Sequence, residues 1–113
     1  ALLDSPDREI IAAQESLVQE NRRRIDELAR EARGLGIDQE TMDAWREDSS
    51  GKKLKEIRAV AEQESSPKRR YLRWQYQRGW WRHHRAQKKI EQLEKRQRCL
   101  AVRALCHFAD HFS

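Results

Sequence analysis

A basic and aromatic segment between residues 68 and 89 carries the residue types best suited to chemistry in this 113-residue sequence. Lys and Arg side chains neutralise phosphates with release of counterions, and aromatic rings stack on exposed bases. The segment has no Asp or Glu, so it predicts a surface that binds nucleic acid without strong sequence specificity. The residues expected to make these contacts are Lys68, Arg69, Arg70, Arg73, Trp74, Arg78, Trp81, Arg82, Arg85, Lys88 and Lys89.

Helical spacing would place cations and rings of this segment on one side. The residues that follow one another in steps of three and four are Tyr71, Trp74, Arg78, Trp81, Arg85 and Lys88. Aromatic residues on a helix are also typical of core packing, and basic runs are typical of solvated faces. We therefore assign Tyr76 and Trp80 to packing, and both interpretations stay open for Trp74 and Trp81.

The charge of the chain is unevenly distributed. Residues 67–113 carry 13 Lys and Arg against 3 Asp and Glu, whereas residues 1–66 carry 11 against 16. A basic half attracts polyanions, either DNA or RNA, an acidic membrane or an acidic protein. Large aliphatic residues are sparse in the first twenty residues of the basic half, which argues against a membrane surface. The acidic half is an alternative partner, because it could neutralise the basic half across a hairpin.

The elements that must position the basic segment are helical. The sequence has only 4 Gly and 2 Pro, and no stretch alternates apolar and polar residues as a strand would. We expect an all-α domain: an elongated helical hairpin or small bundle with one long C-terminal helix and coiled-coil-like packing. Ser5-Pro6 and Ser66-Pro67 are helix-start signals. The expected segments are a first long helix in 1–36, two short helices in 37–66 and a long basic aromatic helix in 67–113.

Two apolar seams indicate how the helices pack. Ile11, Val18 and Ile25 recur every seven residues in the first helix, and a seam with steps of three and four runs through the long helix. About 45 helical residues span about 68 Å. We expect the first three helices to lie end to end along this length, and Gly79 in the seam to leave room for Trp45.

Motifs for catalysis and metal binding are weak. The sequence has no Gly-rich phosphate loop, no Ser-His-Asp arrangement and no paired-carboxylate constellation. Cys106, His107, Asp110 and His111 are of metal-ligand types, but a closed site would need further ligands. We expect no enzyme activity, no cofactor, no metal and no small-molecule substrate.

Cys99 and Cys106 are seven residues apart, too distant on a helix to bridge each other. Reduced thiols favour an intracellular protein, cytoplasmic or nuclear, and no run approaches the roughly 18 apolar residues of a membrane span. The chain begins with Ala1, which is typical of a fragment.

Two alternatives to the nucleic-acid module remain. One is a protein-interaction or homo-oligomerisation (coiled-coil) module that uses the helix seams or the apolar residues near Leu105. The other is an accessory helical domain of a larger nucleic-acid enzyme.

Overall fold

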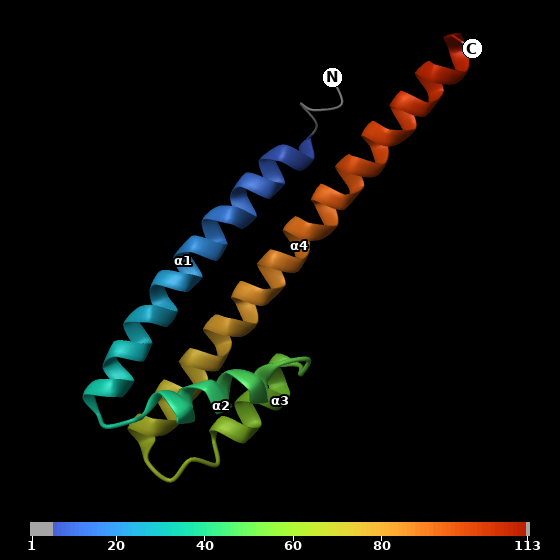
Figure 1. Cartoon of the computed structure of the whole chain (residues 1–113). Coiled ribbons are helices and arrows are strands. Elements are labelled where there is room, and N and C mark those ends of the chain that lie inside the picture. Colours follow the sequence, from blue (N-terminus) through green and yellow to red (C-terminus); the bar gives the residue numbers. More distant parts are fainter. Residues whose placement is uncertain (1–5, 113) are drawn as a thin grey trace.

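The computed structural model describes residues 6–112, except for the side chains of Phe108 and residues 110–112. This part of the chain contains four helices and no strand: α1 (Pro6–Gly34), α2 (Gln39–Ser49), α3 (Leu54–Ala61) and α4 (Pro67–Phe112). The molecule is elongated, with extents of 69 × 22 × 21 Å (Figure 1). These observations confirm the all-α prediction and the long C-terminal helix. The expected cap Ser5 lies outside the described residues.

α1 and α4 form an antiparallel hairpin (Figure 1). The first turn of α1 meets the later part of α4 at Asp7 and Arg96, whose charged atoms lie 3.6 Å apart. At the other end, Lys68 Nζ lies 3.3 Å from Glu31 Oε1. The apolar seams face each other between these two points, so the coiled-coil-like packing is confirmed.

A tight turn ends α1 and sends the chain back toward α4. Gly36 has a φ of +85°, which a residue with a side chain rarely adopts. The Ile37 N–H donates to Ala32 O (3.0 Å) and the Gly36 N–H donates to Arg33 O (3.0 Å), the hydrogen-bond pattern of a Schellman cap. Asp38 then caps α2 by accepting from the Thr41 N–H at 2.8 Å.

The hydrophobic core lies where α2 and the C-terminal half of α1 meet the N-terminal half of α4. Trp45 of α2 packs edge-on against Tyr76 of α4, and Tyr76 packs in the same way against Trp80, both at 6.4 Å between ring centroids. Met42 is fully buried beside them. The assignment of Tyr76 and Trp80 to packing is therefore confirmed, with only 4% and 7% of their surface exposed.

The expectation that the first three helices lie end to end along α4 is wrong. α2 and α3 fold back beside the same N-terminal half of α4 that α1 already contacts (Figure 1). The turn at Gly36 causes this, and burial of the Trp45 ring against Tyr76 stabilises it. The C-terminal end of α4 consequently extends past α1.

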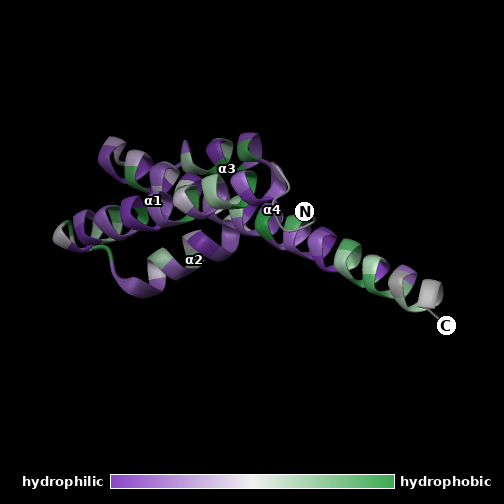
Figure 2. Cartoon of the chain, turned by 90° about the horizontal axis from the view of Figure 1, so that it is seen from above, coloured by the Kyte–Doolittle hydropathy of each residue, from purple (hydrophilic) through white to green (hydrophobic). Residues whose placement is uncertain are grey.

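The end of α4 that extends past α1 is rich in apolar residues, as the hydropathy colouring shows (Figure 2). Val102 and Leu105 there are 56% and 70% exposed. No described helix is both long and apolar enough to cross a membrane.

Gly79 faces α1, and the expectation that it accommodates Trp45 is wrong. A Cβ atom at Gly79 would lie 2.9 Å from Cγ1 of Ile25, which is closer than a methyl group tolerates. Ile25 is 2% exposed, so it has little room to move away. The absence of a side chain at residue 79 therefore lets α1 and α4 approach each other closely.

We predict that Gly79→Ala lowers the free energy of unfolding by about 1–2 kcal/mol, because overpacking against Ile25 outweighs the roughly 1 kcal/mol helix propensity that Ala gains over Gly. In an Ile25→Ala background the same change should become neutral or stabilising, because the obstructing side chain is gone. Urea denaturation of the unaltered chain, the two single variants and the double variant measures both effects. A Gly79→Ala effect of the same sign and size in both backgrounds would contradict the close contact.

Candidate nucleic-acid interface

The first part of the basic segment is neutralised by the acidic half of the chain. Arg73 Nη1 donates to Glu64 Oε1 at 2.7 Å, and Arg73 Nη2 donates to Asp48 Oδ2 at 2.8 Å. Arg69 Nε also donates to Glu64, at 3.0 Å. The Arg73 side chain is only 13% exposed, so its charge stabilises the fold and is poorly accessible to a ligand. The hydrogen bond from Arg73 and the neighbouring Arg69 lower the pKa of Glu64 and keep it ionised.

The second part of the basic segment is not neutralised. Five cations between residues 78 and 89 form no ion pair with any residue that the structure describes: Arg78, Arg82, Arg85, Lys88 and Lys89. Arg70 is likewise exposed and outside the ion-pair network. The intramolecular neutralisation foreseen as an alternative therefore occurs at Lys68, Arg69 and Arg73, and again at Arg96, but the described residues show no ion pair at the five cations between residues 78 and 89.

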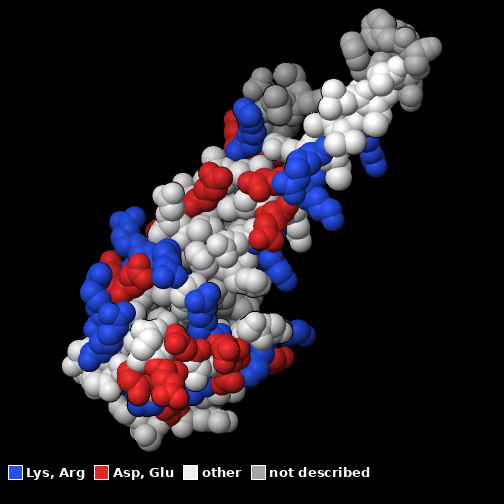
Figure 3. Space-filling model, in the orientation of Figure 1, with Lys and Arg blue, Asp and Glu red and all other residues white. Residues whose placement is uncertain are grey.

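Most of the unpaired cations line a groove of about 1080 Å³ between α1 and α4. Its carboxylates are Glu20 and Glu27. The basic side chains that line it are Arg23, Arg24, Arg82, Arg85, Lys88 and Lys89. We name this hollow the α1–α4 groove. On the face drawn in Figure 3, Asp and Glu gather over α2, and Lys and Arg lie along α1 and α4 together with further Asp and Glu.

Helix geometry extends the α1–α4 groove into a basic stripe. Arg78, Arg82, Arg85 and Lys89 follow one another in steps of four, three and four, so they lie on the same side of α4. At 1.5 Å per residue the stripe is about 16 Å long. Such a stripe matches the spacing of several consecutive phosphates, since duplex DNA carries one charge on each strand per about 3.4 Å.

Arg23 and Arg24 of α1 were missed by the sequence analysis. The signal was present, because three consecutive arginines begin at Arg22 in an otherwise acidic half of the chain. Arg22 pairs with Asp26 at 3.4 Å and Arg24 pairs weakly with Glu27 at 3.5 Å. Which of the three would face α4 depends on the register of the hairpin, and the first helix alone does not fix it.

Trp74 and Trp81 are half-buried and lie away from the α1–α4 groove. The Trp74 ring lies beside α3, with the guanidinium of Arg58 5.5 Å from its centroid. Trp81 lies beside the α2–α3 connection, where its Nε1–H donates to Lys52 O at 3.1 Å. Part of each ring remains exposed, so neither is a pure core residue.

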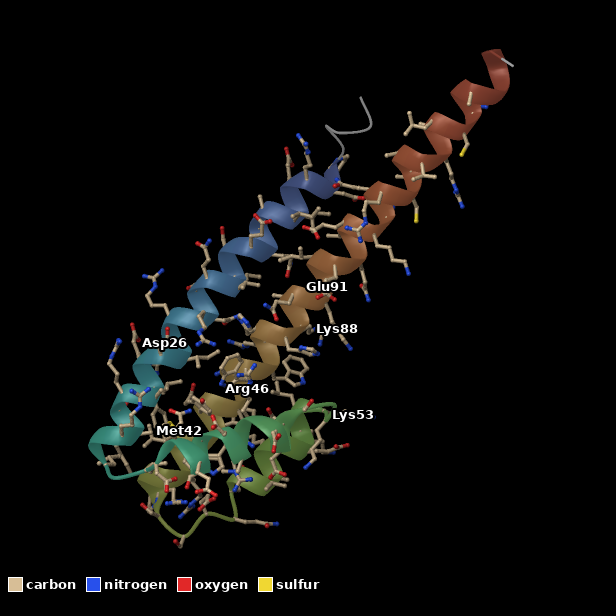
Figure 4. The ribbon with its side chains drawn as sticks, viewed as in Figure 1. Asp26, Met42, Arg46, Lys53, Lys88 and Glu91 are labelled. Carbon is tan, nitrogen blue, oxygen red and sulfur yellow. The ribbon has the colours of Figure 1, made fainter. Side chains whose placement is uncertain are left out.

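His83 is the titratable group buried between α1, α2 and α4. Only 9% of it is exposed, and it packs edge-on against Trp80 at 5.3 Å. Figure 4 labels Arg46, whose guanidinium covers the other part of the same indole at 3.6 Å. Burial lowers the pKa of His83, and the charges of Arg22 and Arg46 and the neighbouring His84 act in the same direction. The backbone of Val18 opposes them by favouring the protonated form.

No group of three or more potential metal ligands occurs among the residues that the structure describes. Cys99 and Cys106 are free and exposed. The side chains of Asp110 and His111, which completed the metal-type cluster in the sequence, lie outside the described residues.

The fold and groove define an all-α hairpin with a basic groove between its two long helices. No family model matches the chain, and neither a curated protein nor a solved structure is similar to it. The interpretation of the groove therefore depends on its own chemistry.

We predict different effects for the paired and unpaired arginines. Arg73→Ala should lower the free energy of unfolding by about 2–3 kcal/mol, because it removes two charge-assisted hydrogen bonds and leaves the partly buried Glu64 with Arg69 as its one remaining partner among the described residues. Arg82→Ala should change it by less than about 0.5 kcal/mol. Arg73→Lys, a charge-preserving control, should restore only part of the loss, because one ammonium cannot replace the fork that bridges two carboxylates. Equal stabilities of Arg73→Ala and Arg82→Ala in urea denaturation would refute the distinction between paired and unpaired arginines.

We predict that the buried His83 makes the folded chain less stable in mild acid. Its pKa is lowered in the folded chain from the ordinary value of 6.5, so the unfolded chain binds the proton more readily. The free energy of unfolding should therefore fall as the pH drops below about 6.5, and go on falling until the lower pKa of folded His83 is passed. Carboxylates such as Glu64 contribute only at lower pH, near and below their ordinary value of 4.5.

Denaturant unfolding between pH 7.5 and 5 measures this dependence. His83→Gln, which stays neutral, should flatten the curve, whereas the control His84→Gln at an exposed position should keep the decline. A curve that His83→Gln leaves unchanged would assign the decline to other groups.

Proposed function

We propose that this chain is a non-catalytic, intracellular nucleic-acid-binding module whose contact surface is the α1–α4 groove. The observation that carries the proposal is the concentration of unpaired cations there. Four unpaired cations of α4 line the groove together with two arginines of α1, of which Arg24 pairs with Glu27 at 3.5 Å. Asp48 of α2 and Glu64 after α3, in contrast, are held by Arg69 and Arg73. Six basic side chains line this groove against two carboxylates, so it keeps an excess of positive charge despite the ion pairs elsewhere in the chain.

Binding in the α1–α4 groove would be driven by counterion release. Each phosphate neutralised by Lys or Arg adds about −0.9 to the slope of log K against log salt for duplex DNA, and about −0.7 for a single strand. Four to six contacts therefore predict a slope of roughly −3 to −5. Contacts of this kind carry no direct base information, which favours binding without strong sequence specificity.

The helical hairpin supports this role by holding the cations in place. Arg82, Arg85 and Lys89 project from a helix whose opposite side is fixed by Tyr76 and Trp80 in the core. Cations on a rigid helix lose less conformational entropy on binding than cations in a mobile tail. The same groove would serve a free-standing module or an accessory domain of a larger nucleic-acid enzyme.

A second candidate is self-association through the end of α4. The observation in its favour is the exposure of Val102 and Leu105, which follow the Asp7–Arg96 ion pair along α4. Leu93, by contrast, is 7% exposed and belongs to the intramolecular seam, so a dimer through that residue would have to open the hairpin. Sedimentation of the purified chain over a range of concentrations tests this candidate.

Fluorescence anisotropy with a labelled 20-nucleotide strand tests the nucleic-acid proposal. We predict that the triple change of Arg78, Arg82 and Arg85 to Gln weakens binding at least tenfold in low salt. It should also reduce the magnitude of the slope of log K against log salt by about 2–3, because each of the three lost phosphate contacts contributes about 0.7–0.9. Helicity should be unchanged, because these residues form no ion pair within the described structure.

The matched control changes Lys95, Arg98 and Arg103 to Gln. These residues lie on the same helix, are exposed and carry the same total charge, but none lines the α1–α4 groove or belongs to the stripe from Arg78 to Lys89. The control should lose no more than about threefold in affinity. Equal losses in the two triple variants would mean that only net charge matters, and the groove would then not be the site.

A further inference from the structure

A second hollow lies on another side of α4. It has a volume of about 500 Å³ and is formed by the end of α2, the α2–α3 connection and the middle of α4. Its basic lining includes Arg46 and Lys52, and its carboxylate is Glu47. We name it the connection pocket. The exposed His84 and the half-buried Trp81 also line it.

Two cations join the connection pocket to the α1–α4 groove. Arg85 and Lys88 line both hollows, so they form a positively charged ridge across α4. Lys88 is labelled in Figure 4, on the part of α4 beyond the α2–α3 connection. Neither Arg85 nor Lys88 is held by a carboxylate of the described residues. A polyanion bound in the groove can therefore continue over the ridge without a break in positive charge.

Trp81 lies at the far end of this path, with its indole N–H engaged. Its indole N–H donates to Lys52 O at 3.1 Å, which ties the ring to the α2–α3 connection. The guanidinium of Arg85 lies 5.1 Å from the ring centroid, within cation–π distance. A half-buried ring whose N–H is already engaged loses less freedom on stacking than a fully mobile side chain would.

We infer that the ligand of this surface is single-stranded nucleic acid, which follows the α1–α4 groove, crosses the Arg85–Lys88 ridge and places a base on Trp81 in the connection pocket. This inference rests on the proposed function and specifies its substrate class. A strand of flexible backbone can bend around one helix, and its unpaired bases are free to stack. A duplex is stiff over about 150 base pairs and keeps its bases inside, so it could follow the groove but not reach Trp81.

Trp74 supplies a contrast within the same segment. It is also a half-buried tryptophan of α4, but it lies against Arg58 of α3 and lines neither hollow. The path described above passes Trp81 and not Trp74. Of the two tryptophans expected from the sequence to stack on bases, only Trp81 is therefore assigned that role.

The test compares three probes on the unaltered chain: a 15-nucleotide single strand, an abasic strand of the same length, and a duplex of the same sequence. The abasic strand keeps the phosphates and removes the stacking bases. The single strand should bind about tenfold more tightly than either other probe, as expected for one stacked base. It should also quench tryptophan fluorescence, whereas the abasic strand should not.

A pair of variants tests whether the base stacks on Trp81: Trp81→Leu and its matched control Trp74→Leu. Trp81→Leu should lower affinity for the single strand to the level of the abasic strand and leave abasic and duplex binding unchanged. Trp74→Leu should leave all three affinities within about twofold. Because the probe comparison uses the unaltered chain, it remains decisive even if Trp81→Leu does not fold.

The outcomes separate this inference from the proposed function. Salt-dependent binding that is equal for all three probes, or tighter for the duplex, would overturn the single-strand assignment and leave the α1–α4 groove intact. Equal loss of single-strand affinity in Trp74→Leu and Trp81→Leu would remove Trp81 as the stacking platform. Failure of all three probes to bind at low salt would refute the nucleic-acid function itself.

Discussion

The guanidinium of Arg73 holds two carboxylates from different parts of the chain, Glu64 after α3 and Asp48 in α2, at 2.7 and 2.8 Å. This interaction docks α2 and α3 onto the first part of α4, where Gln77 adds a buried hydrogen bond to Trp45 O at 2.7 Å. It also has an electrostatic consequence. Asp48 and Glu64 are bound at the first residues of the basic segment, whereas the cations from Arg78 to Lys89 form no ion pair within the described residues.

Much of the fold was predictable because it depends on local signals. Helix-start signals such as Ser66-Pro67 and the three- and four-residue steps of the seams depend only on neighbours along the chain, and they support the all-α prediction. The relation between helices was not predictable in this way. The register that brings Ile25 onto Gly79 depends on contacts between residues far apart in sequence, and so does the chain reversal that packs Trp45 edge-on against Tyr76. The apolar residues of one helix seam do not specify which residues of another helix pack against them.

The residue types of the candidate site were predictable from the sequence. Which of its arginines are held in ion pairs and which are free for a ligand was not predictable. The sequence shows one continuous basic run, and only the structure separates Arg73, which is 13% exposed and bridged, from Arg82, which is exposed and unpaired. Arg23 and Arg24 join the site because the hairpin places α1 alongside α4. Long-range pairing of this kind also explains why an acidic half does not cancel a basic half. Neutralisation occurs only where the helices bring opposite charges within reach.

The central claim is that ligand contacts concentrate on the unpaired part of the basic segment. A residue-resolved NMR titration of the chain with a short single strand tests it most directly, through the backbone amides and the Nε–H signals of the arginines. The account predicts that signals of Arg78, Arg82 and Arg85 shift together with those of Arg23 on α1, while Arg73 and the exposed Arg103 stay in place. Shifts spread evenly over all arginines, or largest at Arg103, would contradict it.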